Sequence, residues 1–221
     1  MLKIAVFDSG YGGDLFADRL EEELPIANVI RVIDWRNAEI FLKNPRAARK
    51  QAMEALRPYI ERVDLIILAN YLLTATSLKY FKRKYKKQKF CGLALPCPNN
   101  QSKRPTVALT TKALAKTLNY HNYLFRLKRH VDTMCLDDWP ALIDDGELDE
   151  VDIKARFDEF FLKYNYKPGE IILACSQFND IVPELRNVVS NNIKIHDGFD
   201  KAIRDACKML NIRGGIGKKC K

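Results

Sequence analysis

Short apolar runs that alternate with helical patterns constrain the fold of this chain more than any other feature. The first half holds four runs that read as buried strands, at residues 3–7, 29–33, 65–69 and 90–95. Helical periodicity fills the segments between them, and helices are expected at residues 45–62 and 74–87 among others. Parallel strands need crossover connections, which are usually helices, so this order predicts parallel sheets covered by helices. The expected fold class is therefore α/β.

A turn-rich segment at residues 96–105 divides this pattern into two rounds. It contains three prolines and two adjacent asparagines, residues that interrupt regular structure. The second round has strand-like runs at residues 106–109, 131–134, 171–174 and 193–196, and a last helical pattern at residues 199–210. We therefore predict two α/β domains, with ligands bound at the carboxyl ends of their strands.

The composition is that of a folded protein outside the membrane. Of the 221 residues, 47% are hydrophobic, which supports a buried core. No apolar stretch approaches the roughly 20 residues that span a bilayer, and the first residues lack a signal-peptide pattern. We expect a cytoplasmic protein without membrane contact. Six cysteines without a CxxC pair predict free thiols, and no zinc spacing with the three histidines is present, so we expect no metal.

Residues 79–89 form a strongly basic segment in a chain whose net charge is +9. Its lysines alternate with Tyr80, Phe81 and Tyr85, a pattern that could contact phosphates. The pattern also fits a helix whose rings pack inward while the lysines face solvent. We favour this second interpretation, because no nucleic-acid-binding motif is present, and we expect no specific nucleic-acid binding.

Two strand-like runs of the same build end in different functional groups. The run at residues 65–69 is followed by Asn70, and the run at residues 171–174 is followed by Cys175. A thiol can exchange a proton near neutral pH, whereas an asparagine amide cannot. The two strand ends predict a cleft in which proton-transfer groups face a ligand from both sides, with the group on one side replaced by an amide that cannot transfer a proton.

The glycine-rich segment FDSGYGG, residues 7–13, follows a strand and precedes a helix. Glycines allow backbone amides to approach a ligand, and a helix N-terminus attracts anions. The segment lacks the lysine of a P-loop and is not GxGxxG, so a carboxylate fits better than a nucleotide. A tight strand–helix turn with Asp8 as a helix cap explains the same residues equally well.

Four segments together carry a family resemblance. Residues 7–13 match the motif FDSGxGG at every fixed position, and residues 110–120 are similar to GTxxTxxSxxY. Residues 175–178 are similar to CTHY, and Asp197-Gly198 resembles a late Asp-Ser pair. On these segments the chain resembles the glutamate racemases and the wider aspartate/glutamate racemase superfamily, over roughly residues 3 to 210.

This resemblance implies two pseudo-symmetric α/β domains with parallel central sheets and a cleft between them. We predict their extents as residues 1–98 with 197–221, and residues 99–196. Family members need no cofactor and act on a small amino acid or carboxylate, and a homodimer is a possible assembly. Two cysteines flank the substrate α-carbon, one removing its proton and the other supplying a proton to the opposite face.

Carried over residue by residue, the match is incomplete at the catalytic groups. Asp8 and Ser9 are retained, and Cys175 matches the second catalytic cysteine. Asn70 stands at the first cysteine, and Gln177 replaces the histidine beside the second. Removing one catalytic base typically costs on the order of 10²–10⁴ in rate. Efficient glutamate racemisation is therefore not expected.

The substrate contacts are altered as well. Tyr71 and Leu72 replace an Asn-Thr pair that grips the substrate, and residues 39–41 replace a PYG substrate loop. Ser176 keeps the hydroxyl of the family's threonine, and Asp144 lies close to the position of an acidic partner. Lost hydrogen-bonding contacts compound the loss of a base.

Two functions remain open. The first is a diverged superfamily enzyme whose cofactor-independent proton chemistry uses one cysteine, as in arylmalonate decarboxylase. The predicted catalytic residues are Cys175 and Asp8. The predicted substrate-binding residues are Ser9, Gly10, Asn70, Thr110, Thr111, Ser176 and Gln177. The second is a catalytically inactive protein that keeps the fold as a ligand-binding or interaction module.

The state of the cleft separates these functions. An open pocket that gathers Cys175, Asp8 and Thr111 favours the enzyme. A cleft filled by Phe41, Tyr71 and Leu72 favours the inactive protein. An open pocket also predicts that Cys175 is the most readily alkylated cysteine outside the tail, with modest reactivity, because access and thiolate character control that rate.

Overall fold

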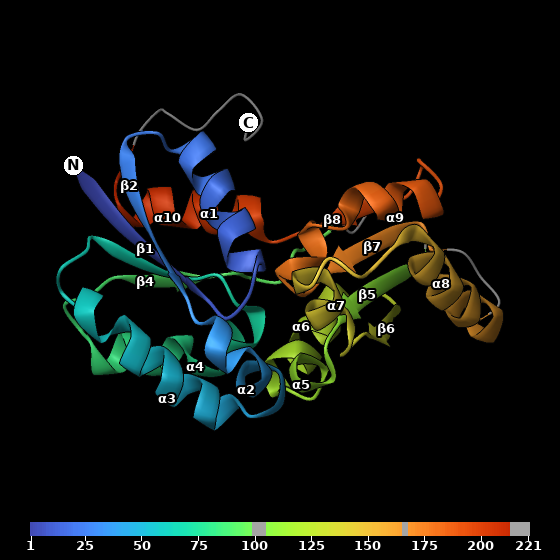
Figure 1. Cartoon of the computed structure of the whole chain (residues 1–221), viewed down its shortest axis with the longest axis horizontal. Helices are drawn as coiled ribbons and strands as arrows, with labels where there is room; N and C mark the ends of the chain where they lie inside the picture. Colours follow the sequence, from blue (N-terminus) through green and yellow to red (C-terminus); the bar gives the residue numbers. More distant parts are fainter. Residues whose placement is uncertain (99–104, 165–167, 213–221) are drawn as a thin grey trace.

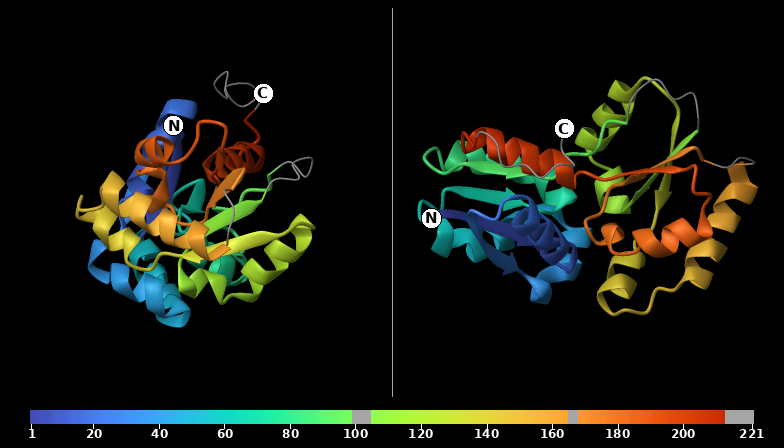
Figure 2. Two further views of the ribbon diagram at one scale, coloured as in Figure 1. Left: turned by 90° about the vertical axis from the view of Figure 1, so that its right-hand side faces the viewer. Right: turned by 90° about the horizontal axis from the view of Figure 1, so that it is seen from above.

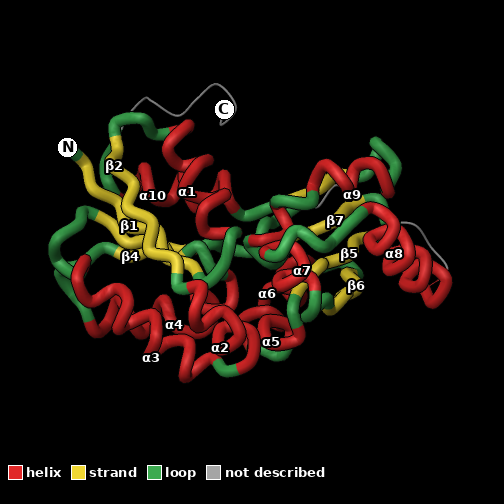
Figure 3. The backbone as a smooth tube through the Cα atoms, viewed as in Figure 1, coloured by secondary structure: helices red, strands yellow, loops and turns green. Residues whose placement is uncertain are grey.

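The computed structural model describes residues 1–98, 105–164 and 168–212. Within these residues the strands form two separate four-stranded sheets, each with helices on both sides (Figure 1, Figure 3). Every strand pair is parallel. The predicted α/β class, with two parallel-sheet domains, is confirmed.

The first sheet is built from the N-terminal segment. Its elements are β1 (Leu2–Asp8), α1 (Gly12–Glu23), β2 (Ala27–Ile33), α2 (Ala38–Lys43), α3 (Pro45–Leu56), β3 (Leu65–Leu68), α4 (Tyr71–Lys84) and β4 (Phe90–Gly92). Short 3₁₀ turns at Trp35–Asn37 and Arg57–Tyr59 join some of them. The strand order is β2-β1-β3-β4.

The second sheet repeats this plan. Its elements are β5 (Thr106–Thr110), α5 (Lys112–Ala115), α6 (Leu118–Leu127), β6 (Val131–Cys135), α7 (Trp139–Asp144), α8 (Glu150–Tyr164), β7 (Glu170–Leu173), the 3₁₀ turn Gln177–Asn179, α9 (Val182–Val188) and β8 (Lys194–His196). The strand order β6-β5-β7-β8 matches that of the first sheet. In each half the carboxyl ends of the two central strands lie side by side, and this places the residues that follow them at one edge.

Both faces of the first sheet are buried, which explains why its strands are almost entirely apolar. Ile4 and Val6 of β1 pack into one core cluster, while Ala5 and Phe7 pack into another on the opposite face. This alternation follows the two-residue period of a strand. The first cluster also contains Ala108 from the second half, so the two halves share a core.

The last helix, α10 (Phe199–Met209), returns to the first half. Its Phe199 ring meets the Phe16 ring of α1 edge-on, with centroids 5.1 Å apart. Figure 2 shows α10, in red, on the lobe that contains the N-terminus, away from the second sheet. This is the placement that the predicted boundary at residue 197 requires. The exact domain extents stay a prediction.

Two helix boundaries differ from the sequence patterns, and two short helices were not expected. The helix expected at residues 45–62 ends at Leu56, because Pro58 lacks an amide proton for the next turn. The helix expected at residues 74–87 begins at Tyr71, because Asn70 caps it. The short helices α2 and α7 were not anticipated at all.

The basic segment has the arrangement expected of a solvated helix end. Phe81 is fully buried, and its ring stacks on Phe90 and Tyr85 at centroid distances of 5.4 and 6.5 Å. Lys82 and Arg83 are exposed. Phe81 therefore belongs to the core, Tyr85 packs partly against it, and the exposed charges form a basic face.

No helix among the described residues is long and apolar enough to cross a bilayer. The tail with Cys220 and most of the predicted linker lie outside the described residues.

Candidate functional site

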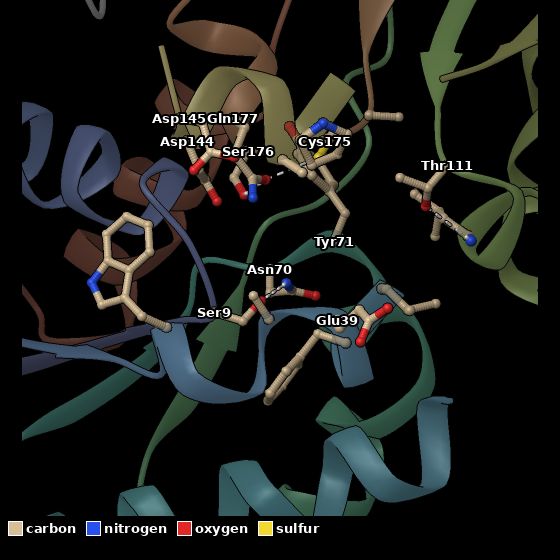
Figure 4. Close-up of a pocket in the computed structure, with 18 of the residues that line it drawn as sticks. Ser9, Glu39, Asn70, Tyr71, Thr111, Asp144, Asp145, Cys175, Ser176 and Gln177 are labelled. Carbon is tan, nitrogen blue, oxygen red and sulfur yellow. Dashed lines mark hydrogen bonds between the residues drawn. The ribbon is translucent and has the colours of Figure 1, made fainter. Parts of the chain in front are cut away.

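A cavity of about 370 Å³ lies where the strand ends of the two halves meet (Figure 4). This volume is within the range of small-molecule sites, roughly 300–1,000 Å³. The described residues that line it are Ser9, Trp35, Arg36, Ala38, Glu39, Phe41, Asn70, Tyr71, Leu72, Thr111, Leu114, Pro140, Ala141, Asp144, Asp145, Ala174, Cys175, Ser176 and Gln177.

Asp8, at the end of β1, is the buried centre beneath this cavity. Its side chain has no exposure to solvent. It accepts hydrogen bonds from the Asn70 amide at 2.9 Å, the Ser176 hydroxyl at 2.7 Å and the Ser9 backbone amide at 2.7 Å. Burial raises the pKa of Asp8 from 3.8 to about 7, although the three hydrogen bonds oppose this shift. A carboxyl group with such a pKa can accept or release a proton near neutrality.

Asn70 uses its amide for structure. Its oxygen accepts from the Leu73 backbone amide at 2.9 Å, which caps α4. Its nitrogen donates to Asp8 and lies 3.5 Å from the Ser9 hydroxyl. Asn70 therefore joins a helix N-terminus to the buried carboxyl group, while one side of it still lines the cavity.

Cys175 follows β7 and lines the cavity from the second half. It is only 8% exposed, and its thiol donates to the Gln177 side-chain oxygen at 3.0 Å. Burial, and secondarily the charge of Asp8, raises the pKa of this thiol well above its usual value. At neutral pH Cys175 is a protonated thiol, suited to donating a proton.

This environment bears on the expected order of thiol reactivity. Cys97 and Cys135 are exposed, whereas Cys175 is buried and its pKa is raised. Alkylation requires both access and thiolate, so Cys97 and Cys135 should react first. The burial of Cys175 argues against the expectation that it reacts first, and the order of thiol reactivity stays a prediction for alkylation to test.

Two hydroxyl groups face the cavity as hydrogen-bond donors. Thr111 accepts from the Leu114 backbone amide at 3.4 Å and so caps α5. The Ser9 hydroxyl accepts from the Asn70 amide. Each hydroxyl keeps its own proton for a ligand, since the described contacts use it only as an acceptor.

Two predicted substrate contacts, Gly10 and Thr110, do not line the cavity. Thr110 is fully buried. A Cβ at Gly10 would lie 2.5 Å from Gln177 Nε2, and a Cβ at Gly12 would lie 2.4 Å from Ser176 Cβ. Gly10 and Gly12 therefore let the two halves pack closely together at this turn.

The cavity is open beside three apolar side chains. Phe41, Tyr71 and Leu72 form part of its wall and do not fill it. The Tyr71 hydroxyl accepts a hydrogen bond from the Gly198 backbone amide at 2.8 Å, which holds the ring against the start of α10. The sequence criterion for an open pocket is met for Cys175 and Thr111, while Asp8 lies behind Ser9, Asn70 and Ser176.

Sequence reasoning missed several residues of the cavity wall outside the strand ends. Arg36 follows β2, and Pro140, Ala141 and Asp145 come from α7 and its end. Asp144 Oδ1 accepts from the Tyr11 backbone amide at 3.1 Å, and burial raises the pKa of Asp144. A proline at a first helical turn was the available signal for α7.

The candidate metal ligands are dispersed. Among the described residues no group of three or more His, Cys, Asp or Glu side chains is arranged to hold a metal ion. The polar groups at the cavity are those of acid–base chemistry.

Known proteins resemble this chain over nearly its whole length, although no protein-family model matches it. Glutamate racemase of Bifidobacterium animalis subsp. lactis is 22% identical over 227 residues, covering 96% of this chain and 86% of that protein. The structure of Escherichia coli glutamate racemase in complex with L-glutamate and an activator has a TM-score of 0.87 at 18% identity, covering 96% of this chain and 84% of that one. Allantoin racemase from Klebsiella pneumoniae has a TM-score of 0.60 at 15% identity, covering 99% and 91%.

These similarities confirm the predicted resemblance to the aspartate/glutamate racemase superfamily. The fold is that of glutamate racemase. The roles of individual cavity residues stay predictions.

Proposed function

We propose that this chain is a racemase-like, cofactor-independent enzyme that moves a proton at the α-carbon of an amino acid or small carboxylate. The observation that carries this proposal is the pairing of a cavity-lining thiol, Cys175, with the buried carboxyl group of Asp8. Ser176 connects the two, because it follows Cys175 in sequence and donates to Asp8. The similarity to glutamate racemases supplies the class of reaction.

The two proton-transfer groups have complementary states at neutral pH. The raised pKa of Cys175 keeps its proton on sulfur, so the thiol is an acid. The pKa of Asp8, about 7, leaves a substantial fraction as carboxylate, so Asp8 is the base, acting through the Ser176 hydroxyl. The α C–H bond breaks, its proton passes through the Ser176 hydroxyl to Asp8, and its electron pair moves into the substrate carboxylate. The Cys175 thiol then gives its proton to carbon, and the Asp8 carboxyl group returns a proton to the resulting thiolate.

The enediolate formed in this step needs hydrogen-bond donors. Ser9 and Thr111 supply hydroxyl protons at the cavity wall, one from each half. Donors that are already in place stabilise developing charge without reorganisation. Asn70 has no ionisable group, so this chain is not an efficient two-base glutamate racemase.

Deuterium exchange tests the proposal directly. Single amino acids are incubated with the protein in D₂O, and α-deuteration is followed by NMR and mass spectrometry. Cys175→Ala should lower the exchange rate on the order of 10²–10⁴-fold. Cys135→Ala removes an exposed thiol outside the cavity and should leave the rate unchanged. Undiminished exchange in Cys175→Ala, or no exchange with any amino acid, refutes the proposal.

A second candidate is a binding protein without catalysis. Its support is that the polar groups bond to each other, since Cys175 donates to Gln177 and Asp8 accepts three hydrogen bonds. This candidate predicts ligand binding without any α-deuteration, so the same experiment separates the two functions.

A further inference from the structure

The walls of the cavity carry more negative than positive side chains. Glu39, Asp144 and Asp145 line it, and Arg36 is the basic residue within the described lining. Figure 4 shows Asp144 and Asp145 above the cavity and Glu39 below it. The carboxylates therefore face the cavity from both halves of the molecule.

Within the described part of the chain, the last turn of α7 offers Asp144 and Asp145 no basic partner, and Asp144 accepts hydrogen bonds from the Tyr11 amide and the Gln177 side chain instead. Both aspartates lie at the C-terminal end of α7, where unpaired carbonyls add partial negative charge. After burial, the charges that raise the pKa of Asp144 are those of Asp145 and Asp180, both acidic. A positively charged group in the cavity would relieve this repulsion.

A second carboxylate on the ligand would instead be repelled by the carboxylates of the cavity wall. The superfamily resemblance places a substrate-gripping Asn-Thr pair at Tyr71 and Leu72, and the Tyr71 hydroxyl is occupied by the Gly198 amide. The same resemblance places a substrate loop where Glu39 stands. The resemblance therefore implies that groups gripping the substrate have been exchanged for an apolar side chain, an occupied hydroxyl and a carboxylate.

Aromatic side chains complete a lining suited to a cation. Trp35 lines the cavity with 46% of its surface exposed, and Phe41 and Tyr71 line it as well. A cation over an aromatic face is attracted by the ring quadrupole, and tryptophan is the strongest such partner. Carboxylates combined with aromatic rings are poorly matched to an anion.

We infer that this cavity selects an amino acid whose side chain ends in a positively charged group, and discriminates against dicarboxylic amino acids. The inference rests on the proposed function, because it takes the cavity to be the substrate site. The α-carboxylate of the ligand lies toward the Ser9 and Thr111 hydroxyls, and its cationic end lies toward Asp144 and Asp145.

Isothermal titration calorimetry with three probes tests this inference. L-lysine and L-norleucine have the same side-chain length and differ by the terminal ammonium, and L-glutamate carries the second carboxylate. L-lysine should bind about tenfold or more tightly than L-norleucine, which corresponds to about 1.4 kcal/mol. L-glutamate should bind more weakly than either.

Two charge-removing variants locate the effect. Asp145→Asn should weaken L-lysine binding about three- to tenfold and leave L-norleucine binding unchanged, because one nearby charge is worth roughly that much in a partly solvated site. Glu147→Gln is the matched control, since Glu147 is exposed, close in sequence and absent from the cavity lining. This variant should bind all three probes as the native protein does.

Several outcomes overturn the inference. They are tighter binding of L-glutamate than of L-lysine, equal losses in Asp145→Asn and Glu147→Gln, and no binding of any probe at about 10 mM, well above common KM values. The proposed function fails separately. L-lysine that binds without α-deuteration preserves the inference and refutes the enzyme, whereas deuteration of L-glutamate alone does the reverse.

Discussion

The two halves of the molecule share one strand order but end their central strands differently. After β3, Asn70 caps α4 and holds Asp8, so its amide is committed to two structural hydrogen bonds. After β7, Cys175 makes one hydrogen bond to a neighbouring side chain and lines the cavity with its thiol. Equivalent positions in the two halves therefore place a side chain at the same edge of each sheet. The residue type decides whether that side chain makes structural hydrogen bonds or presents a reactive group to the cavity.

The two other central strands, β1 and β5, also end in different functional groups, and here the titratable group belongs to the first half. β1 ends in Asp8, a titratable group, whereas β5 leads to Thr111, a hydroxyl that caps α5. Each half thus contributes one group that can transfer a proton and one that caps a helix. The two titratable groups, Asp8 and Cys175, come from different halves, and Ser176, which follows Cys175 in sequence, donates to Asp8.

The strongest test of this asymmetry is racemisation itself. We expect glutamate and aspartate racemisation to lie on the order of 10²–10⁴-fold or more below that of a two-base enzyme, because Asn70 cannot act as a base. Circular dichroism of each pure enantiomer at high protein concentration measures this. Turnover of about 1 s⁻¹ or faster, the low end of typical enzymes, would show that the two sides are chemically equivalent after all.

Removing the Asn70 side chain should separate its two structural roles. Asn70→Ala loses the α4 cap and the donor to buried Asp8, and we expect a loss of about 2–3 kcal/mol in the free energy of unfolding. Thr117→Ala is the matched control, since Thr117 caps α6 by accepting from the Tyr120 amide. This control should lose about 1 kcal/mol, the value of a cap alone. Equal losses in urea unfolding would mean that the Asp8 contact adds nothing.

The pH dependence of stability should report the buried state of Asp8. Its pKa is 3.8 when exposed and about 7 in the fold, so between these values the folded protein holds a proton that the unfolded chain has released. Stability should therefore fall as pH rises from about 4 to about 7, at up to about 1.4 kcal/mol per pH unit from this group.

Asp8→Asn isolates that contribution. Asparagine does not titrate, so the difference in unfolding free energy between the native protein and the variant should shrink or change sign as pH rises. Urea titrations of both proteins across this range give the difference. A difference that is constant with pH would mean that Asp8 titrates alike in the folded and unfolded states.

The fold and the strand-end residues of the site could be predicted from the sequence, because both depend on local patterns. Apolar runs marked the strands, and the rule that parallel strands present their carboxyl ends together selected Ser9, Asn70, Thr111 and Cys175. These four line the cavity, whereas Gly10 and Thr110, which the same rule selected, do not. Asn70 was interpreted as a replaced catalyst and a substrate contact, although asparagine before a helix is also a capping signal. The helix was therefore expected to start three residues later than α4 does.

The remainder of the site depends on contacts between distant segments. Gly12 packs on Ser176, and Tyr11 donates to Asp144, both across the interface between the two halves. No local pattern states which residues will meet there. The burial that sets the pKa of Cys175 is likewise a property of the assembled fold. Site residues that directly follow a strand were therefore predictable from the sequence, whereas contacts between the two domains and the pKa values that depend on them were not.

The smallest effect concerns the basic face at the end of α4, which contrasts with the acidic cavity. Its exposed lysines should bind duplex DNA weakly, with a Kd no tighter than about 1 μM at physiological salt, because counterion release supplies the whole attraction. Lys82→Ala with Lys86→Ala should reduce the slope of log K against log salt by about 2. The control is Lys116→Ala with Lys208→Ala, which removes exposed lysines elsewhere and should leave the slope unchanged.

Fluorescence anisotropy with two unrelated duplexes measures both the affinity and its salt dependence. The ring of Phe81 is buried and cannot stack on bases, so we expect no sequence preference. Sequence-selective binding that survives physiological salt would contradict this and would make the basic face a dedicated nucleic-acid site.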